Sequence, residues 1–204
     1  MKTFGGSSTV AALVAALALT VSGCSGPDAT SPPPRTSATL PAGHTWVDVP
    51  TQGVSVAAPQ GWVKFTSKDT PESLAAAAKA LGMTVEELKA TLASQYLLQL
   101  RAPAPDPSNL NASVVDLDQV PSEGALVSQL EAAGAQDVTV RPLRTAVGDA
   151  LLARYRQQVG SVTVHGAGLF VDTGDELLNL TVSSPDESTV TARADVLATS
   201  IHRT

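Results

Sequence analysis

The C-terminal half of the sequence constrains the fold most, because it is a run of extended segments separated by glycine-containing breaks. Four such segments follow one another, at 138–145, 151–159, 162–171 and 177–182. The breaks between them contain Gly148-Asp149, Gly160-Ser161 and Gly174-Asp175, pairs of the kind that two-residue hairpin loops prefer. The sequence therefore predicts four consecutive antiparallel strands joined by tight hairpins.

A helix with clear start signals follows these strands. The segment Ser184-Pro185-Asp186-Glu187 offers a cap, a proline at the first helical position and an acidic residue at the third. Apolar residues then recur at helical spacing, at Val190, Ala194, Leu197 and Ile201. This pattern predicts an amphipathic helix that packs one face on the sheet.

Earlier segments add more helices and strands. Helices are predicted from Thr70 to Gly82, from Thr84 with a capping box, and from Ser122 to Gly134. Extended segments are predicted at 46–49, 54–57, 96–100 and 112–117. Helices combined with an antiparallel sheet give the α+β class, an antiparallel β-sheet flanked by helices.

The N-terminus has the layout of an export signal. Lys2 precedes an unbroken apolar run from Val10 to Leu19, and small residues follow it. A membrane-spanning helix needs about 20 apolar residues, and this run ends well short of that. Val21-Ser22-Gly23-Cys24 resembles the lipobox of bacterial lipoproteins. The resemblance implies that residues 1–23 are a signal peptide and that the Cys24 thiol is acylated.

Residues 24–44 read as a lipidated cysteine followed by a disordered tether, because Pro, Ser and Thr dominate and large apolar residues are nearly absent. Residues 45–204 remain as one domain of a size that buries an ordinary core. The mature protein is therefore expected at the extracytoplasmic face of the cell membrane, where two acyl chains on one residue give stable anchoring.

The order of elements in the domain resembles the PsbP-like α/β/α sandwich. The residues that carry this resemblance are the strand leading into Pro59-Gln60-Gly61-Trp62, the hairpin meander and the closing helix that ends at Ser200-Ile201. More narrowly, the chain is similar to the LpqN-type secreted lipoproteins of actinobacteria. The resemblance implies a binding or assembly role rather than catalysis, in the biogenesis of the cell envelope.

Composition and motifs exclude several function classes. Thirteen Lys and Arg against 19 Asp and Glu give a net charge of -6, which disfavours nucleic acid as a partner. A single cysteine excludes an internal disulfide and a Cys-based zinc cage. The sequence contains none of the usual motifs of serine hydrolases, zinc proteases or phosphate-binding loops. We therefore expect no enzyme, no metal and no cofactor.

One cluster of candidate binding residues stands out. If the first two breaks are two-residue loops, Arg141 lies opposite Arg156, and Arg156 lies opposite His165. Arg154 lies on the same face by the period of two. Because like charges on neighbouring strands repel, the row is predicted to recognise an anion or an acidic partner. The alternative is that acidic residues of this chain neutralise the row or that a bulge shifts the register.

The sequence thus predicts a membrane-anchored, non-enzymatic binding or assembly factor whose partner is an envelope protein, a lipid or a glycolipid. One alternative is a lipid or glycolipid carrier with an apolar cavity under the final helix, and another is an unrecognised hydrolase. The residues expected to line such a cavity are Leu152, Leu169, Val171, Leu178, Leu180 and Val182.

Overall fold

The computed structural model describes residues 38–204 apart from 73, 76–77, 79–83, 118, 160 and 175. The predicted signal peptide, most of the tether and the lipidation site at Cys24 lie outside these residues, as do Val21, Ser22 and Gly23. Most of the helix predicted from Thr70 to Gly82 also lies outside them, although 71–72, 74–75 and 78 are helical.

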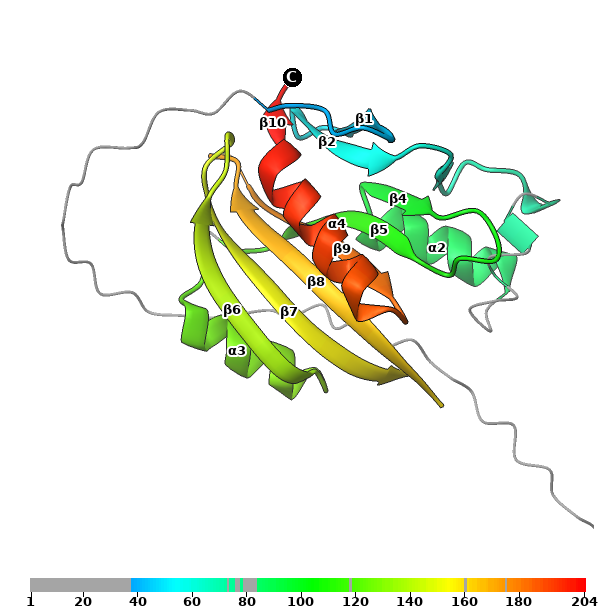
Figure 1. Ribbon diagram of the computed structural model, residues 1–204. Helices are drawn as coiled ribbons and strands as arrows, with labels where there is room; N and C mark the ends of the chain where they lie inside the picture. The colour runs from blue at the N-terminus through cyan, green and yellow to red at the C-terminus, as the bar shows by residue number, and fades with distance from the viewer. Residues whose placement is uncertain are drawn as a thin grey trace, which may run out of the picture.

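A seven-stranded antiparallel sheet forms the middle layer, in the order β3-β4-β5-β9-β8-β7-β6 (Figure 1). Its strands are β3 (Val63–Phe65), β4 (Leu98–Arg101), β5 (Asn109–Val115), β6 (Gln136–Arg144), β7 (Asp149–Val159), β8 (Val162–Asp172) and β9 (Leu177–Ser184). The last four strands pair with their neighbours in the chain, so the predicted meander is confirmed.

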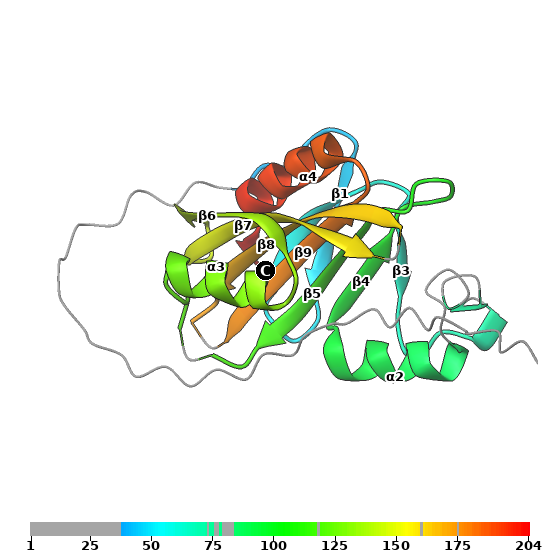
Figure 2. The same cartoon turned by 90° about the horizontal axis from the view of Figure 1, so that it is seen from below.

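Two further layers cover this sheet. A small sheet of β1 (His44–Val49), β2 (Val54–Pro59) and β10 (His202–Arg203) lies on one side together with α4 (Glu187–Ser200). The helices α2 (Val85–Gln95) and α3 (Glu123–Ala132) lie on the other side, as Figure 2 shows. The predicted α+β class, an antiparallel sheet flanked by helices, is confirmed.

The main core lies between the seven-stranded sheet, α4 and the small sheet. Every apolar residue predicted to face inward from the last helix is buried, with 3% or less of its surface exposed: Val190, Ala194, Leu197 and Ile201. They pack against the residues that the carrier alternative placed around a cavity, which belong to the same cluster of buried side chains. Each fully buried Leu, Ile or Val contributes about 1.5–3 kcal/mol to stability.

Smaller clusters hold α3 and α2. Leu126 of α3 packs on Leu151 of β7, Phe170 of β8 and Leu177 of β9, and α3 also contacts β6. Leu88 and Leu92 of α2 pack with Leu74 and Ala78. Beyond Leu177 at the start of β9, Figure 2 shows no described helix directly over β5 and β9.

The helix caps follow the sequence with one exception. Thr84 and Glu87 form the predicted capping box of α2, and Ser122 caps α3. The cap of α4 is Asp186 rather than Ser184, because β9 continues to Ser184. The Ser184 hydroxyl instead accepts a hydrogen bond from the Asp186 N–H, and the Asp186 carboxylate accepts one from the Thr189 N–H.

Two of the three predicted two-residue hairpins are longer than expected. Val159 pairs with Val162, so the β7–β8 loop has two residues as predicted. The β6–β7 and β8–β9 loops have four residues each, at 145–148 and 173–176. In each loop a threonine hydroxyl, of Thr145 or Thr173, accepts the N–H three residues later. These side-chain hydrogen bonds stabilise the longer loops and explain why the prediction was wrong.

Candidate functional site

The predicted basic row is only partly formed. Arg156 lies directly opposite His165, as predicted, but Arg141 lies opposite Leu152 rather than Arg156. The four-residue loop between β6 and β7 shifts the register, and an irregularity between Gln136 and Thr139 shifts it again. The predicted pairing of Arg141 with Arg156 is therefore wrong.

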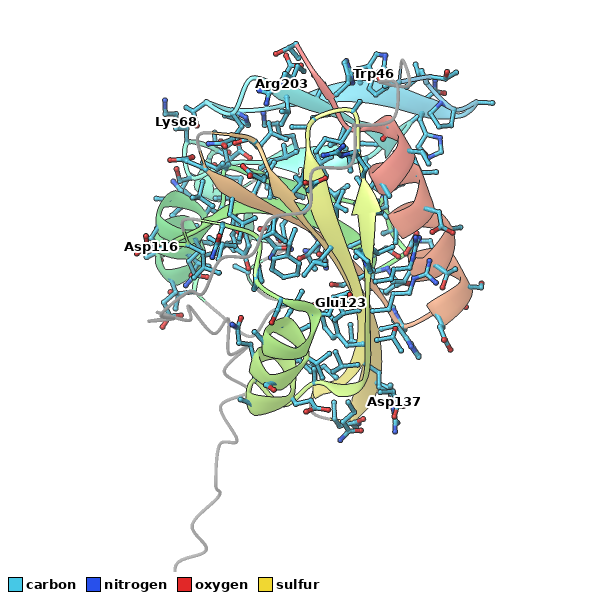
Figure 3. All side chains as sticks on the ribbon, turned by 90° about the vertical axis from the view of Figure 1, so that its left-hand side faces the viewer. Trp46, Lys68, Asp116, Glu123, Asp137 and Arg203 are labelled. Carbon is cyan, nitrogen blue, oxygen red and sulfur yellow. The ribbon has the colours of Figure 1, made fainter. Side chains whose placement is uncertain are left out.

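Two carboxylates compensate the three arginines. Asp195 of α4 accepts from both Arg154 and Arg141, through Nη2 atoms that lie 2.8 and 3.5 Å from its Oδ1. Asp137, which has a φ of 53°, pairs with the Nε of Arg156. Figure 3 shows Asp137 far from the small sheet, where Trp46 lies. Acidic compensation and a shifted register, the two alternatives to an anion site, are both present.

The cluster keeps one more arginine than carboxylates, and His165 lies beside it. Its charged side chains are exposed by 35–71%, so each ion pair contributes at most about 1 kcal/mol to stability. The pairs to Asp195 join α4 to the β6–β7 edge of the sheet. Anion recognition by Arg141, Arg154, Arg156 and His165 stays a prediction.

A second cluster surrounds Trp62. The guanidinium carbon of Arg193 lies 4.6 Å from the centre of the Trp62 ring, a cation–π contact, and its Nη2 lies 3.1 Å from Asp106 Oδ2. Burial opposes the ionisation of Asp106, but hydrogen bonds from Ser108 and the Arg193 charge outweigh it and lower the pKa of Asp106.

Trp62 and Arg193 also line a small cavity together with His44 and Leu197. Its volume is about 10 Å³, which is about the room that one water molecule needs. The cavity is therefore far too small for an acyl chain.

The face of the main sheet that points away from α4 carries an unusual set of side chains. On β4, β5 and β9 this face presents neutral amides and hydroxyls at seven adjacent positions, with the charged Arg101 of β4 beside them. We call these residues the amide face: Gln99, Asn109, Asn111, Ser113, Asn179, Thr181 and Ser183. The intervening residues of the same strands, such as Leu110 and Leu180, are buried in the main core. One face of these strands is therefore aliphatic and the other polar.

The register brings the seven residues into rows. Asn111 lies between Gln99 and Thr181 across three neighbouring strands. Asn109 lies opposite Ser183, and Ser113 lies opposite Asn179. All three asparagines of the chain belong to this face. Since asparagine is depleted in strands, its concentration in two inner strands needs an explanation other than sheet stability.

Few hydrogen bonds join the polar side chains of the amide face to one another. In the described part of the chain, Asn111 Nδ2 donates to Asn109 Oδ1 at 3.5 Å, and Thr181 Oγ1 donates to Asn179 Oδ1 at 3.1 Å. The Oε1 of Gln99 is shielded from solvent and has no hydrogen-bond partner. All seven side chains are half-buried. The face therefore holds donors and acceptors that a ligand can use.

A pair of glycines shapes the margin of the amide face. Cβ atoms at Gly166 and Gly168 would lie 2.6 Å from the Tyr155 ring and 3.2 Å from Asn179 Oδ1 respectively. The two glycines thus make room for a phenol ring and an amide. Burial raises the pKa of Tyr155 and that of Tyr96, and the proximity of Tyr96 raises the pKa of Tyr155 further. Both phenols are protonated at neutral pH.

The sequence carried a signal for this face that the search for charged residues missed. Two segments alternate strictly between neutral polar and apolar residues: Asn109-Leu110-Asn111-Ala112-Ser113 and Asn179-Leu180-Thr181-Val182-Ser183.

Among the residues that the structure describes, no group of three His, Cys, Asp or Glu lies close enough to hold a metal ion. Within the same residues, no helix is both long and apolar enough to cross a membrane.

No protein-family model matches the chain, and no curated protein matches it. Solved structures do match, among them the solution structure of PsbP (CyanoP) from the cyanobacterium Synechocystis sp. PCC 6803. The two chains are 14% identical with a TM-score of 0.51, and the match covers 80% of this chain and 94% of that one. A likeness at this identity concerns the fold alone. It confirms the predicted PsbP-like fold, whereas membership of the LpqN type stays a prediction.

Proposed function

We propose that this chain is an extracytoplasmic lipoprotein of the LpqN type that acts as a non-enzymatic binding or assembly factor in the cell envelope. Residues 1–23 are the signal peptide, 24–44 the lipidated cysteine and tether, and 45–204 the binding domain. The Val21-Ser22-Gly23-Cys24 segment supports the anchor. Two acyl chains on Cys24 hold the domain at the extracytoplasmic face of the cell membrane.

The amide face is the observation that carries the binding role. Seven neutral polar side chains in register, with a solvent-shielded acceptor at Gln99 that lacks a partner, add nothing evident to sheet stability. Residues that serve binding are often kept at a cost to stability. The partner is an envelope component rather than nucleic acid, because the chain carries a net charge of -6.

The basic row of Arg141, Arg154, Arg156 and His165 is a second proposed contact surface. Three arginines against two carboxylates leave one uncompensated positive charge there. An acidic envelope partner can contact this row while a neutral ligand contacts the amide face. The carrier alternative finds less support, because the cavity beside Trp62 is about the size of one water molecule.

Detergent partitioning tests the anchor. The exported chain is expected in the detergent phase, whereas the Cys24→Ser variant is expected in the aqueous phase because it lacks the thiol that receives the lipid. If the exported wild-type chain stays in the aqueous phase, the anchor is wrong.

Selective labelling tests the binding role. Because the chain has only three asparagines and all lie on the amide face, ¹⁵N-asparagine labelling gives three pairs of side-chain amide signals that report on this face alone. A cell-envelope extract is expected to shift these signals. Unchanged signals at saturating extract would contradict binding at this face.

A further inference from the structure

The chemistry of the amide face restricts its ligand. Its seven members are neutral, and each amide or hydroxyl both donates and accepts hydrogen bonds. Arg101, opposite Asn109, is the charged neighbour in the same row of β4 and β5. A ligand that matches this set is itself neutral and carries many groups that both donate and accept. Hydroxyl groups on neighbouring carbons of a sugar ring have this property, since one can donate to an amide oxygen while the next accepts from the amide NH₂.

The spacing of the rows suits an extended chain of such groups. Gln99, Asn111 and Thr181 lie on three neighbouring strands, which are about 4.8 Å apart. This separation is comparable with the length of one sugar unit. An oligosaccharide that lies across the strands can therefore place successive rings over successive rows of amides.

Aromatic rings at the margin fit the same ligand. Tyr155 lies against Gly166 beside Ser183, and Tyr96 lies close enough to Tyr155 to affect its ionisation. A phenol ring offers an apolar surface for the C–H groups of a sugar and a hydroxyl for its polar groups.

Two glutamine oxygens, one on β4 and one at the end of α2 four residues earlier in the chain, lack hydrogen-bond partners. The Oε1 atoms of Gln95, the last residue of α2, and of Gln99 on β4 are shielded from solvent without hydrogen-bond partners. An acceptor left in this state costs free energy. A ligand hydroxyl that donates to the Gln99 oxygen, after a rotation of the side chain, removes that cost.

Other ligand classes fit less well. An extended peptide adds to a sheet at an edge strand, but β5 lies between β4 and β9, and β9 lies between β5 and β8. A lipid chain needs an apolar cavity. An anion meets one arginine, Arg101, at the amide face and three in the basic row on the opposite face.

We therefore infer that the amide face binds a neutral oligosaccharide, with Gln99, Asn111 and Thr181 as the central contacts and Tyr155 at one side. The inference rests on the proposed function, because it names the ligand class of the same face.

A titration of the ¹⁵N-asparagine-labelled chain with neutral hexasaccharides of gluco, manno and galacto configuration tests it. At least one is expected to shift all three side-chain amide signals.

The Asn111→Ala variant is expected to bind that hexasaccharide at least tenfold more weakly, with an unchanged or higher melting temperature. Alanine removes the contact with the ligand, whereas the only structural hydrogen bond that it removes in the described part of the chain is the long one to Asn109. Gln136→Ala removes an exposed amide of the edge strand β6 and should bind like the wild type. An equal loss of binding in both variants overturns the assignment.

If none of the hexasaccharides binds, the envelope extract decides. Periodate cleaves vicinal diols, so a shift caused by the extract that disappears after periodate treatment supports an oligosaccharide ligand. A shift that survives periodate overturns the oligosaccharide ligand, while the binding role stands. If a peptide of residues 25–44 reproduces that shift, the chain's own tether occupies the face. If the extract causes no shift either, the oligosaccharide ligand and the binding role are both contradicted.

Discussion

The ring of Tyr155 on β7 occupies the space beside Gly166, the residue directly opposite it on β8. A Cβ atom at Gly166 would lie 2.6 Å from the ring atoms Cε2 and Cζ and 2.8 Å from the phenol oxygen. These distances are far shorter than a normal contact. The absence of a side chain at Gly166 therefore leaves the space that the Tyr155 ring occupies.

The Gly166→Ala variant is expected to displace this ring. Because the methyl group and the ring need the same space, we expect a loss of about 1–3 kcal/mol in the free energy of unfolding and weaker binding at the amide face. Chemical denaturation measures the first effect. Gly124→Ala on α3 is the control, since a Cβ there meets nothing within 4 Å and alanine favours the helix. Equal stability of both variants would show that the ring moves without cost.

Removal of Asp195 is expected to show whether the basic row binds an anion or is only a structural charge cluster. Asp195→Ala leaves Arg141 and Arg154 without their shared carboxylate, so the free energy of unfolding should fall by less than about 1 kcal/mol. Inorganic phosphate should bind more tightly, as measured by calorimetric titration. Asp149→Ala, which frees only Arg144, should leave phosphate binding unchanged. If phosphate affinity does not respond to Asp195→Ala, the row is only a structural charge cluster.

Arg193 is expected to stabilise the fold more than the exposed arginines do. Arg193→Ala removes a cation–π contact with Trp62 and an ion pair with Asp106, and its side chain is only 20% exposed. We expect a loss of about 2 kcal/mol in the free energy of unfolding. The pKa of Asp106 should rise, which an NMR titration measures. Arg144→Ala provides the comparison, and a similar small effect of both changes would contradict the expectation.

Because of the cap of α4, the stability of the fold is expected to fall at acid pH. Hydrogen bonds from the hydroxyls of Thr189 and Ser188 and from the Thr189 N–H hold the pKa of Asp186 at about 2, below its ordinary value of 3.8. Because the folded-state pKa is the lower one, the stabilisation is present above pH 3.8 and is lost as the pH falls toward 2. Asp186→Asn keeps a capping side chain without the charge. Its melting temperature should fall less than that of the wild type between these two pH values, and parallel losses would contradict the assignment.

The elements of the fold were predictable where one local rule decides them. The period of Val190, Ala194, Leu197 and Ile201 identified the buried face of α4, since each of these residues meets the sheet. The length of the loops at 145–148 and 173–176 was not predictable from their glycines. It depends on hydrogen bonds that backbone N–H groups donate to the hydroxyls of Thr145 and Thr173. The pairing of β10 with β2 also had no local signal, since it joins segments far apart in the chain.

The candidate site was predictable only in part for the same reason. The position of Arg156 opposite His165 depends on one tight loop, and its prediction was correct. The position of Arg141 depends on a longer loop and an irregular strand, and it was wrong. The amide face escaped notice because its rows exist only once β5 lies between β4 and β9, an order that no single segment encodes.

The pairing of β5 with β9 makes ligand binding a measure of folding. Asn111 and Thr181 lie opposite each other in the sheet although 70 positions separate them in the chain. A ligand that needs both cannot bind the unfolded chain, in which these residues are apart. It therefore adds RT ln(1 + [L]/Kd) to the free energy of unfolding, about 2.7 kcal/mol at a ligand concentration 100 times Kd. Binding at the amide face is thus expected to raise the melting temperature as the concentration of the ligand rises.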